Sequence, residues 1–358
     1  MKSIKFTGES PLEWGRQHGE SLKTEIFELN EIRQSLLRKY LASWDSSKIS
    51  TLCLAHLKTL ESKYSNLYQE VLGVHQSSGL PLEDLMIVNA YTDLRDFSYG
   101  ESNRVEDGCS IMAIKSENAN WVAQTWDMHA SATPYTVLLD YPEVPELELK
   151  SQKVLSVAGC LGLAGINHFG VSVMINNMHC KEFQTTGLIW TGLVRELLNQ
   201  ESAAIALEHL RSNLPSSGHN YMICDAKHAL NVETTGKRLE VTSEISQDKG
   251  GHYFHTNHYL GSLANSEIME RQSPTTHKRY KVLEKYFSET DWQNAKAEQL
   301  QKDFFESGEV CSTICIPPSA KDANAGATCG GLIVDYKARV ATGFKGLLND
   351  GDTVSIRF

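Results

Sequence analysis

The feature that most constrains this chain is a predicted β-hairpin that brings a thiol close to a carboxylate. Segments 110–114 and 121–126 are rich in β-branched and aromatic residues, and the polar turn 116–120 lies between them. Such a pattern is typical of two strands joined by a short loop. If the hairpin folds about the centre of this turn, Cys109 and Asp127 are cross-strand partners about 5 Å apart. A register shift of one residue would send them to opposite faces of the sheet.

The residue before this cysteine is Gly108, and the pair suits cleavage of the chain by its own thiol. Glycine tolerates unusual backbone angles and leaves its carbonyl open to attack. Attack by the thiol of Cys109 would give a thioester, and water would then release a new N-terminus. The freed α-amine has an ordinary pKa of about 7.7–8.0, so it can serve as the base for its own thiol. The alternative is that Cys109 is an inert, small core hydrophobe.

Five short motifs, in order along most of the chain, resemble one family. They are Asp107-Gly108-Cys109-Ser110, Trp126-Asp127, segment 165–173, His255-Thr256-Asn257-His258 and Gly326-Ala327-Thr328. The sequence resembles the acyl-CoA:6-aminopenicillanic acid acyltransferases and their bacterial relatives. These are a cysteine branch of the N-terminal-nucleophile (Ntn) hydrolases, so the resemblance implies autocleavage between Gly108 and Cys109.

The catalytic residues that we predict are Cys109, Asp127 and Asn257. A carboxylate at position 127 would hold the new α-ammonium of Cys109 and tune its pKa, although it could also cap or pair at a strand end. The resemblance gives the side-chain amide of Asn257 the role of an oxyanion donor, a contact worth about 3 kcal/mol of transition-state stabilisation. The alternative for Asn257 is an Asx-turn that ends a strand.

Four further residues are candidate substrate-binding residues. Met128 and His129 directly follow Asp127, and Asn176 and Asn177 end a strand in a region that borders the pocket of the relatives. Cysteine Ntn enzymes often carry an arginine near the nucleophile, late in the chain. Segment 311–316 contains none, so we expect an anionic or acyl-binding contact to be missing, which argues against penicillin-like substrates.

Two other motifs could suggest a metal or a cofactor. His252, His255 and His258 are spaced by three, but on a strand His255 points away from the other two, and zinc needs ligands that converge. The glycines of segment 159–165 lack the order of a dinucleotide-binding motif. We therefore expect neither a metal nor a cofactor.

Composition limits the partners. The net charge of −10 argues against nucleic acid or an anionic membrane as a partner. No apolar run approaches the roughly 18 residues of a membrane span, and the first residues lack the apolar core of a signal peptide, so we expect a cytoplasmic protein. The eight scattered cysteines fit a reducing compartment.

Helical and strand patterns alternate in blocks, which predicts an α+β fold with two β-layers covered by helices. The resemblance implies the four-layer αββα sandwich of the Ntn hydrolases. Residues 1–108 would become a helical α-chain that stays packed on the β-chain of residues 109–358, as one structural unit that could form a homo-oligomer. The predicted strands are 109–115, 121–127, 134–140, 152–158, 162–167, 171–177, 219–225, 228–235, 238–243, 310–316, 329–336, 338–344 and 353–358, and the later helices are 187–211 and 275–305.

Together these features predict an autoprocessed N-terminal-cysteine amidohydrolase. It would cleave the amide of a small N-acyl amine or N-acyl amino acid through an acyl-thioester. One alternative is transfer of an acyl group from CoA to a small amine, although nothing in the sequence resembles a CoA phosphate cradle. Another is a non-catalytic or metal-binding protein in which Cys109 is inert.

Overall fold

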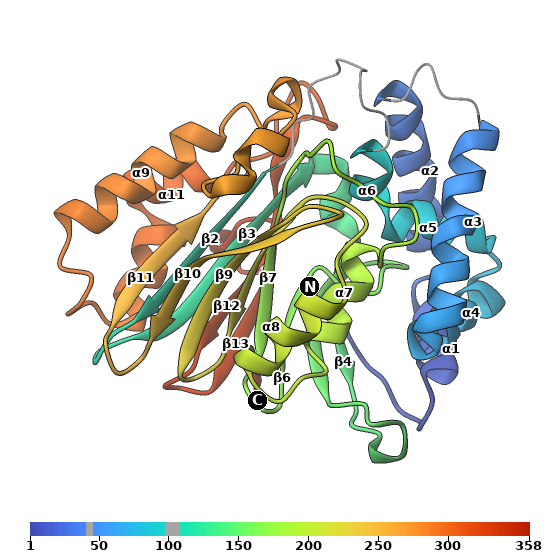
Figure 1. Cartoon of the computed structure of the whole chain (residues 1–358), viewed down its shortest axis with the longest axis horizontal. Coiled ribbons are helices and arrows are strands. Elements are labelled where there is room, and N and C mark those ends of the chain that lie inside the picture. Colours follow the sequence, from blue (N-terminus) through green and yellow to red (C-terminus); the bar gives the residue numbers. More distant parts are fainter. Residues whose placement is uncertain (41–45, 97–107) are drawn as a thin grey trace.

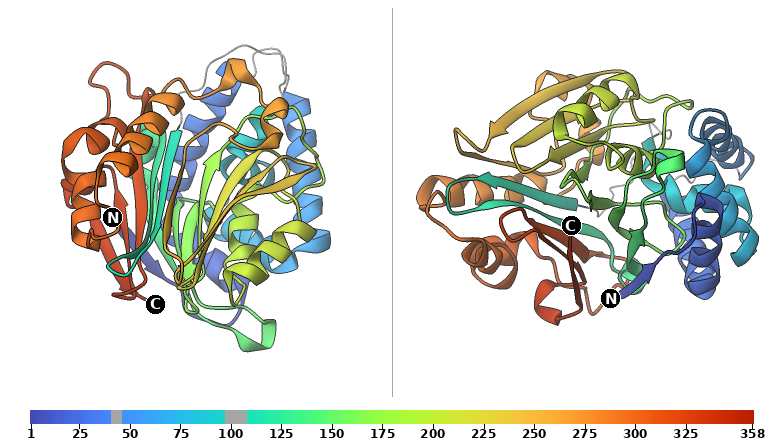
Figure 2. Two further views of the ribbon diagram at one scale, coloured as in Figure 1. Left: turned by 60° about the vertical axis from the view of Figure 1, so that its left-hand side comes forward. Right: turned by 90° about the horizontal axis from the view of Figure 1, so that it is seen from below.

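Two β-sheets pack face to face between layers of helices in the computed structural model, which describes residues 1–40, 46–96 and 108–358 (Figure 1). The view from below in Figure 2 shows the helices of the N-terminal region beyond one sheet and those of the C-terminal region beyond the other. The four-layer αββα sandwich expected from the sequence is therefore confirmed.

In the described part of the chain, the first sheet has eight strands. β1 is parallel to β4, and the other neighbours are antiparallel. In spatial order the strands are β1 (Lys2–Lys5), β4 (Thr136–Tyr141), β5 (Gln152–Val157), β6 (Ala164–Asn167), β7 (Ser172–Asn177), β8 (His219–Cys224), β9 (His228–Thr234) and β10 (Leu239–Ser246).

The second sheet has six described strands, all antiparallel to their neighbours, and it carries the predicted hairpin. In spatial order they are β11 (Gly251–His255), β2 (Gly108–Lys115), β3 (Asn120–His129), β12 (Gly326–Asp335), β13 (Val340–Lys345) and β14 (Thr353–Arg357). The central position of β2 and β3 buries the hairpin on both faces.

Eight described helices cover the first sheet. They are α1 (Pro11–Ser21), α2 (Lys23–Tyr40), α3 (Ser46–Lys63), α4 (Ser65–Ser78), α5 (Leu82–Asn89), α6 (Tyr91–Asp96), α7 (Trp190–Leu197) and α8 (Ala203–Ser212). Local sequence signals set several of their ends. Ser10 caps α1 by accepting a hydrogen bond from the Glu13 backbone, and Gly79 ends α4 with a positive φ of 86°.

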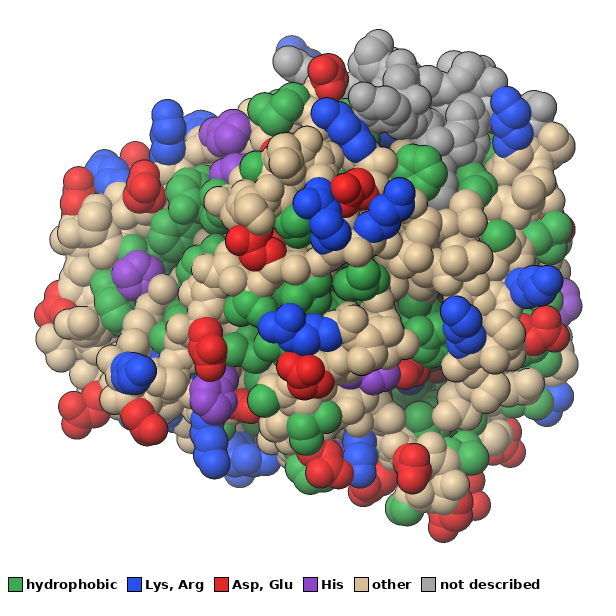
Figure 3. Space-filling model, viewed as in Figure 1, with side chains coloured by type: hydrophobic (Ala, Val, Ile, Leu, Met, Phe, Trp, Pro, Cys, Tyr) green, Lys and Arg blue, Asp and Glu red, His purple; other side chains and the backbone are tan. Residues whose placement is uncertain are grey.

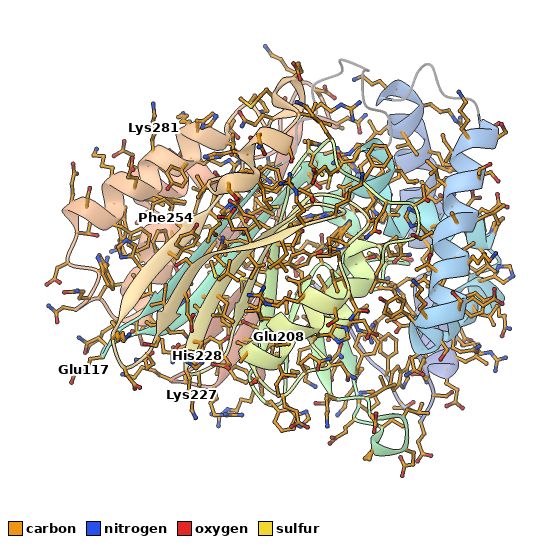
Figure 4. The ribbon with its side chains drawn as sticks, viewed as in Figure 1. Glu117, Glu208, Lys227, His228, Phe254 and Lys281 are labelled. Carbon is orange, nitrogen blue, oxygen red and sulfur yellow. The ribbon has the colours of Figure 1, made fainter. Side chains whose placement is uncertain are left out.

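The second sheet is covered by α9 (Thr276–Glu289), α10 (Ala297–Gln301), a π-helical turn (Lys302–Glu306) and α11 (Gly308–Ile314). Phe254 of β11, labelled in Figure 4, stacks on Phe287 of α9 at 5.3 Å between ring centroids. Trp121 of β3 stacks on Phe304 of the π-helical turn at 5.7 Å. These aromatic side chains form the core between the sheet and its helices.

The register of the β2–β3 hairpin differs from the predicted one by a single residue. Cys109 pairs with Trp126, and Gly108 pairs with Asp127. The hairpin closes on a four-residue loop between Lys115 and Asn120, and the Lys115 ammonium donates to the Asn120 side chain at 2.6 Å. The prediction that Cys109 faces Asp127 is therefore wrong, because this polar contact shortens the loop. The two side chains lie on opposite faces of the sheet.

Three predicted elements need correction. Segment 310–316 is not a strand, because Val310 and Ile314 bury their side chains one helical turn apart in α11. Segment 187–211 forms two helices, α7 and α8, and segment 275–305 ends its first helix at Glu289. Packing on the second sheet overrides the β-branched composition of segment 310–316.

The described surface carries charges of both signs. The face in Figure 3 shows acidic and basic side chains interspersed over the strands and helices. None of the described helices has the length and apolar character that crossing a bilayer requires. No disulfide joins the eight cysteines, all of which lie in the described part of the chain.

Candidate active site

A small cavity lies where β2 begins and β3 ends, and Cys109 is part of its wall. Its volume is about 10 Å³, which is room for roughly one water-sized group. The other described residues that line it are Thr92, Gly108, Trp126, Asp127, Met128, Ile175, Asn177, Trp190 and Asn257. Residues from the helical N-terminal region and from both sheets therefore meet at this cysteine.

The backbone of Cys109 is held on both sides by buried side chains. Its N–H donates to Asn257 Oδ1 at 2.8 Å. Its carbonyl accepts from Asn176 Nδ2 at 2.9 Å and from Arg279 Nη1 at 2.6 Å. Contacts at both the nitrogen and the carbonyl of Cys109 hold the Gly108–Cys109 bond in one position. A bond that is to react needs such fixed positioning.

Arg279 is a site residue that the sequence analysis missed. It lies on α9, it is fully buried, and its Nη2 donates to Asn257 Oδ1 at 2.8 Å. An arginine therefore does lie beside the cysteine, on α9 rather than in segment 311–316. It contacts Cys109 and Asn257, so the expectation that an anionic or acyl-binding contact is missing stays a prediction. A signal existed in the sequence, because Arg279 shares the apolar face of α9 with Leu283 and Phe287 at helical spacing.

Asn257 accepts two hydrogen bonds through Oδ1, from the Cys109 N–H and from Arg279. Its Nδ2 donates to the Asn177 carbonyl at 2.9 Å, and its own N–H donates to Thr276 Oγ1 at 2.8 Å. The two donors at Oδ1 fix the orientation of the amide. Asn257 thus contacts the nitrogen of the Gly108–Cys109 bond, while its role at an oxyanion stays a prediction.

Asp127 lies across from Gly108 on the outer face of β3. Its Oδ1 accepts from Thr328 Oγ1 at 2.7 Å, and its Oδ2 lies 3.2 Å from the point where a Cβ on Gly108 would stand. The same Cβ would lie 2.8 Å from Arg279 Nη2, so only glycine fits here without displacing the guanidinium. The predicted role of Asp127 at the α-amine remains a prediction.

A second, wider cavity of about 250 Å³ lies on this outer side. It is lined by Gly108, Asp127, Ser273, Pro274, Thr275, Ile316 and Gly326. The bond between Gly108 and Cys109 therefore has a cavity on each side. Asp107, the first residue of the motif that suggested autocleavage, lies outside the described residues.

The four predicted substrate-binding residues separate into two groups. Met128 and Asn177 line the cavity at Cys109, and Asn176 donates to the Cys109 carbonyl. His129 is not among the residues that line it. Its Nδ1 is 2.8 Å from Ser131 Oγ, and its ring meets the Tyr91 ring edge-on at 6.0 Å. The alternation of side chains along β3 sends His129 to the other face from Met128.

A buried carboxyl lies behind the cavity. Asp93 of α6 accepts from Ser217 Oγ at 2.7 Å and from the Trp190 backbone N–H at 3.3 Å. Burial raises the pKa of the Asp93 carboxyl to about 7. Burial also lowers the pKa of His219, which stacks on the Trp190 ring, to about 3. The Asp93 carboxyl and the His219 ring are therefore both mainly uncharged between about pH 4 and 6.

The three histidines that could suggest a metal have other contacts. His252 stacks on Phe287, His255 Nε2 is 3.0 Å from Glu233 Oε1, and His258 Nδ1 is 2.9 Å from Thr276 Oγ1. Among residues 1–40, 46–96 and 108–358, no group of three or more His, Cys, Asp or Glu side chains is arranged to hold a metal ion.

An αββα sandwich with a glycine–cysteine pair at the head of a central strand defines the Ntn-hydrolase class of fold. Comparison with known proteins agrees with this class. The chain belongs to the acyl-coenzyme A:6-aminopenicillanic acid acyl-transferase family, whose model matches residues 114–316, more than half of the chain. It is therefore an enzyme of the amidohydrolase and acyltransferase class. The matched segment includes Asp127, Asn257 and Arg279 and begins after Cys109.

Individual relatives are distant in sequence. The 40 kDa form of acyl-coenzyme A:6-aminopenicillanic-acid acyltransferase from Emericella nidulans is 23% identical over 347 residues, which cover 96% of this chain and 92% of the relative. Penicillin V acylase from Agrobacterium tumefaciens is 12% identical, with 66% of this chain and 82% of that chain covered and a TM-score of 0.41. A variant of conjugated bile acid hydrolase from Clostridium perfringens is 9% identical, with 70% and 92% covered and a TM-score of 0.45.

Proposed function

We propose that this protein cuts its own chain between Gly108 and Cys109 and then hydrolyses the amide of a small N-acyl amine or N-acyl amino acid. The observation that carries the proposal is the pair of contacts on Cys109. Asn257 Oδ1 accepts from its N–H, and Arg279 Nη1 donates to its carbonyl. Such contacts suit a residue whose nitrogen must leave one bond and then act as a base.

Self-cleavage begins when the Cys109 thiolate attacks the Gly108 carbonyl carbon. The Gly108–Cys109 C–N bond breaks, the nitrogen takes up the proton that the thiol has lost, and a thioester joins Gly108 to Cys109. Water then hydrolyses this thioester, which gives a carboxylate on Gly108 and a free thiol and α-amine on Cys109. The leaving nitrogen already faces an acceptor at 2.8 Å, Asn257 Oδ1, so the new amine stays in position.

Turnover uses the same residue on an external amide. The α-amine takes the thiol proton, Sγ attacks the acyl carbon, and the amine product leaves with that proton. Water then releases the acid from the acyl-thioester. Asn257 has a second N–H beyond the one that it donates to Asn177, which is available to an oxyanion. Arg279 is a positioning residue, because it acts on Cys109 and Asn257 rather than on the substrate.

The two fragments are expected to stay together. Thr92 of the proposed α-chain lines the same cavity as Cys109 of the proposed β-chain, and one continuous core joins α1–α6 to the first sheet. Loss of the α-chain would therefore open the site and expose that core.

Purified wild type and Cys109→Ala, compared on a denaturing gel, test self-cleavage. We expect two fragments that split after Gly108 in wild type and an intact chain in the variant. A thiol-reactive probe should label wild type at Cys109. An intact wild type in which Cys109 does not react with the probe would favour the alternative of an inert cysteine.

Acyl transfer from CoA to a small amine is the second candidate, and the acyltransferase names of the family and of the Emericella nidulans relative favour it. Both reactions share the acyl-thioester and differ only in the acceptor. Product analysis with and without a small amine separates them. We expect free acid as the main product in both cases. A predominant N-acyl product when amine is present would assign the transferase instead.

A further inference from the structure

Three side chains that line the Cys109 cavity have polar atoms with no hydrogen-bond partner among the described residues. They are Thr92 Oγ1, Asn177 Oδ1 and Trp190 Nε1. The exposed fractions of these residues are only 3%, 6% and 5%. A buried polar group without a partner costs about 1–3 kcal/mol, so three of them around the cavity at Cys109 mark this wall as a candidate binding surface.

The three atoms differ in what they can bind. The indole N–H of Trp190 only donates, the amide oxygen of Asn177 only accepts, and the hydroxyl of Thr92 can do both. The orientation of Asn177 is fixed by its neighbours. Its Nδ2 lies 3.5 Å from His179 Nε2, while His179 Nδ1 lies 2.9 Å from Asp96 Oδ1. The amide nitrogen is therefore the donor to His179, and the amide oxygen is the atom without a partner.

This donor and acceptor set selects an uncharged ligand group. An ammonium only donates, so it would leave the Trp190 N–H unmatched. A carboxylate only accepts, so it would face the lone pairs of Asn177. A hydroxyl or a carboxamide both donates and accepts. Trp126, Met128 and Ile175 in the rest of this wall are apolar. The carboxyl residue that also lines it, Asp127, directs its side chain to the outer face of β3, where Oδ1 accepts from Thr328.

Position and size decide which part of the substrate this is. The cavity contains Cys109, so whatever is bonded to its sulfur lies there, and in the acyl-thioester that is the acyl group. Its volume of about 10 Å³ is roughly that of one water-sized group, so the acyl group that it accepts must be short. A long hydrocarbon chain does not fit this space.

We propose that the acyl group transferred to Cys109 is short and carries an uncharged hydroxyl or carboxamide, which bonds to Thr92, Asn177 and Trp190. This inference rests on the proposed function of Cys109 as an acyl-accepting nucleophile. It adds the chemical class of the acyl group.

Three p-nitrophenyl esters test the proposal on the processed enzyme. They carry the hydroxyacetyl, propionyl and glycyl groups, which are similar in size and differ in one terminal group. Sγ attacks the ester carbonyl, p-nitrophenolate leaves, and the thiol proton passes to the Cys109 amine. The first-turnover release of p-nitrophenolate, divided by the rate with free cysteine in solution, corrects for the reactivity of each ester.

We expect hydroxyacetyl to exceed propionyl and glycyl at least ten-fold in this corrected rate, since the site is built around hydrogen bonds that the other two do not complete. In Thr92→Val and Trp190→Phe, this ratio should fall toward one. Thr59→Val removes a buried hydroxyl that bonds to the Ala55 carbonyl in α3, away from the site, and should keep the ratio. Because the ratio is internal to each sample, partial misfolding of a variant does not change it.

Three results would overturn the inference: equal corrected rates for hydroxyacetyl and propionyl, glycyl as the fastest ester, or a ratio unchanged in both Thr92→Val and Trp190→Phe. Failure of the proposed function looks different. In that case wild type would release no more p-nitrophenolate from any ester than Cys109→Ala does, and the inference would fall with it.

Discussion

Two buried arginines, Arg195 and Arg279, show how the same side chain serves two purposes in one fold. Arg195 on α7 donates through Nη1 to both oxygens of Glu70 at 3.0 Å, and its guanidinium lies 3.6 Å from the centre of the Tyr141 ring. Arg279 on α9 donates to the Cys109 carbonyl and to Asn257 Oδ1. One arginine joins a helix to the first sheet, and the other contacts the residue proposed to react.

This difference shows how to distinguish a buried arginine that stabilises the fold from one that assists the reaction. A guanidinium that meets a carboxylate is neutralised locally, and its removal leaves a buried charge behind. A guanidinium aimed at a peptide carbonyl polarises and holds that peptide group. We therefore expect loss of Arg195 to lower stability and loss of Arg279 to slow chemistry.

Arg195→Met should have the largest effect. It leaves the Glu70 carboxylate buried without its charge partner, so the free energy of unfolding in urea should fall by about 3–5 kcal/mol. Arg211→Met, at an exposed pair with Glu208, is the matched control and should change it by less than about 0.5 kcal/mol. If Arg195→Met and Arg211→Met lower the free energy of unfolding equally, the assignment of a structural role to Arg195 is contradicted.

Arg279→Met should slow scission after Gly108 by roughly 10²-fold, because the Cys109 carbonyl and Asn257 lose a shared donor. Arg279→Lys keeps the charge but lacks the fork that reaches both atoms, so its rate should lie between those of Met and wild type. The measurement is pulse-labelling followed by a denaturing gel, with the folded fraction determined in parallel. Scission at the wild-type rate in Arg279→Met would contradict the assignment.

Asp93 extends the comparison to buried carboxyls. Its pKa is about 7 in the folded protein and near 3.8 when unfolded, so unfolding releases a proton between these values. Stability therefore falls with rising pH, by roughly 2 kcal/mol between pH 5 and 7 relative to Asp93→Asn, which does not titrate. The difference in unfolding free energy between the two proteins should level off above pH 8. A flat difference across this range would show that Asp93 is already ionised at pH 5.

Thr328→Val should have the smallest effect. It removes the hydrogen bond to Asp127 Oδ1, which should cost about 1–2 kcal/mol in the free energy of unfolding. Thr342→Val, which removes an exposed contact with Ser355, is the control and should be nearly neutral. If the two substitutions cost the same, Asp127 does not depend on Thr328 for its orientation.

Local patterns predicted the strands of the hairpin, because alternating apolar residues and a polar loop lie within twenty positions of each other. They did not predict its register, since the loop length depends on the contact between Lys115 and Asn120. Segment 310–316 was predicted as a strand, because packing of Val310 and Ile314 against distant elements decides its helical state.

Some residues of the candidate site could also be predicted from the sequence, and others could not. Cys109 and Asn257 could be singled out from short motifs, because the resemblance to a family supplied their roles. Arg279 is 170 positions from Cys109, and no spacing in the sequence links the two. Contacts between residues this far apart in the sequence can be seen only in the structure.

The most direct test of self-activation at residue 109 is mass spectrometry of enzyme that is turning over an amide, denatured just before injection. We expect a fragment of residues 109–358 that begins with an unmodified cysteine, together with its partner ending at Gly108. A fully active sample in which all the protein has the mass of the uncut 358-residue chain would contradict it.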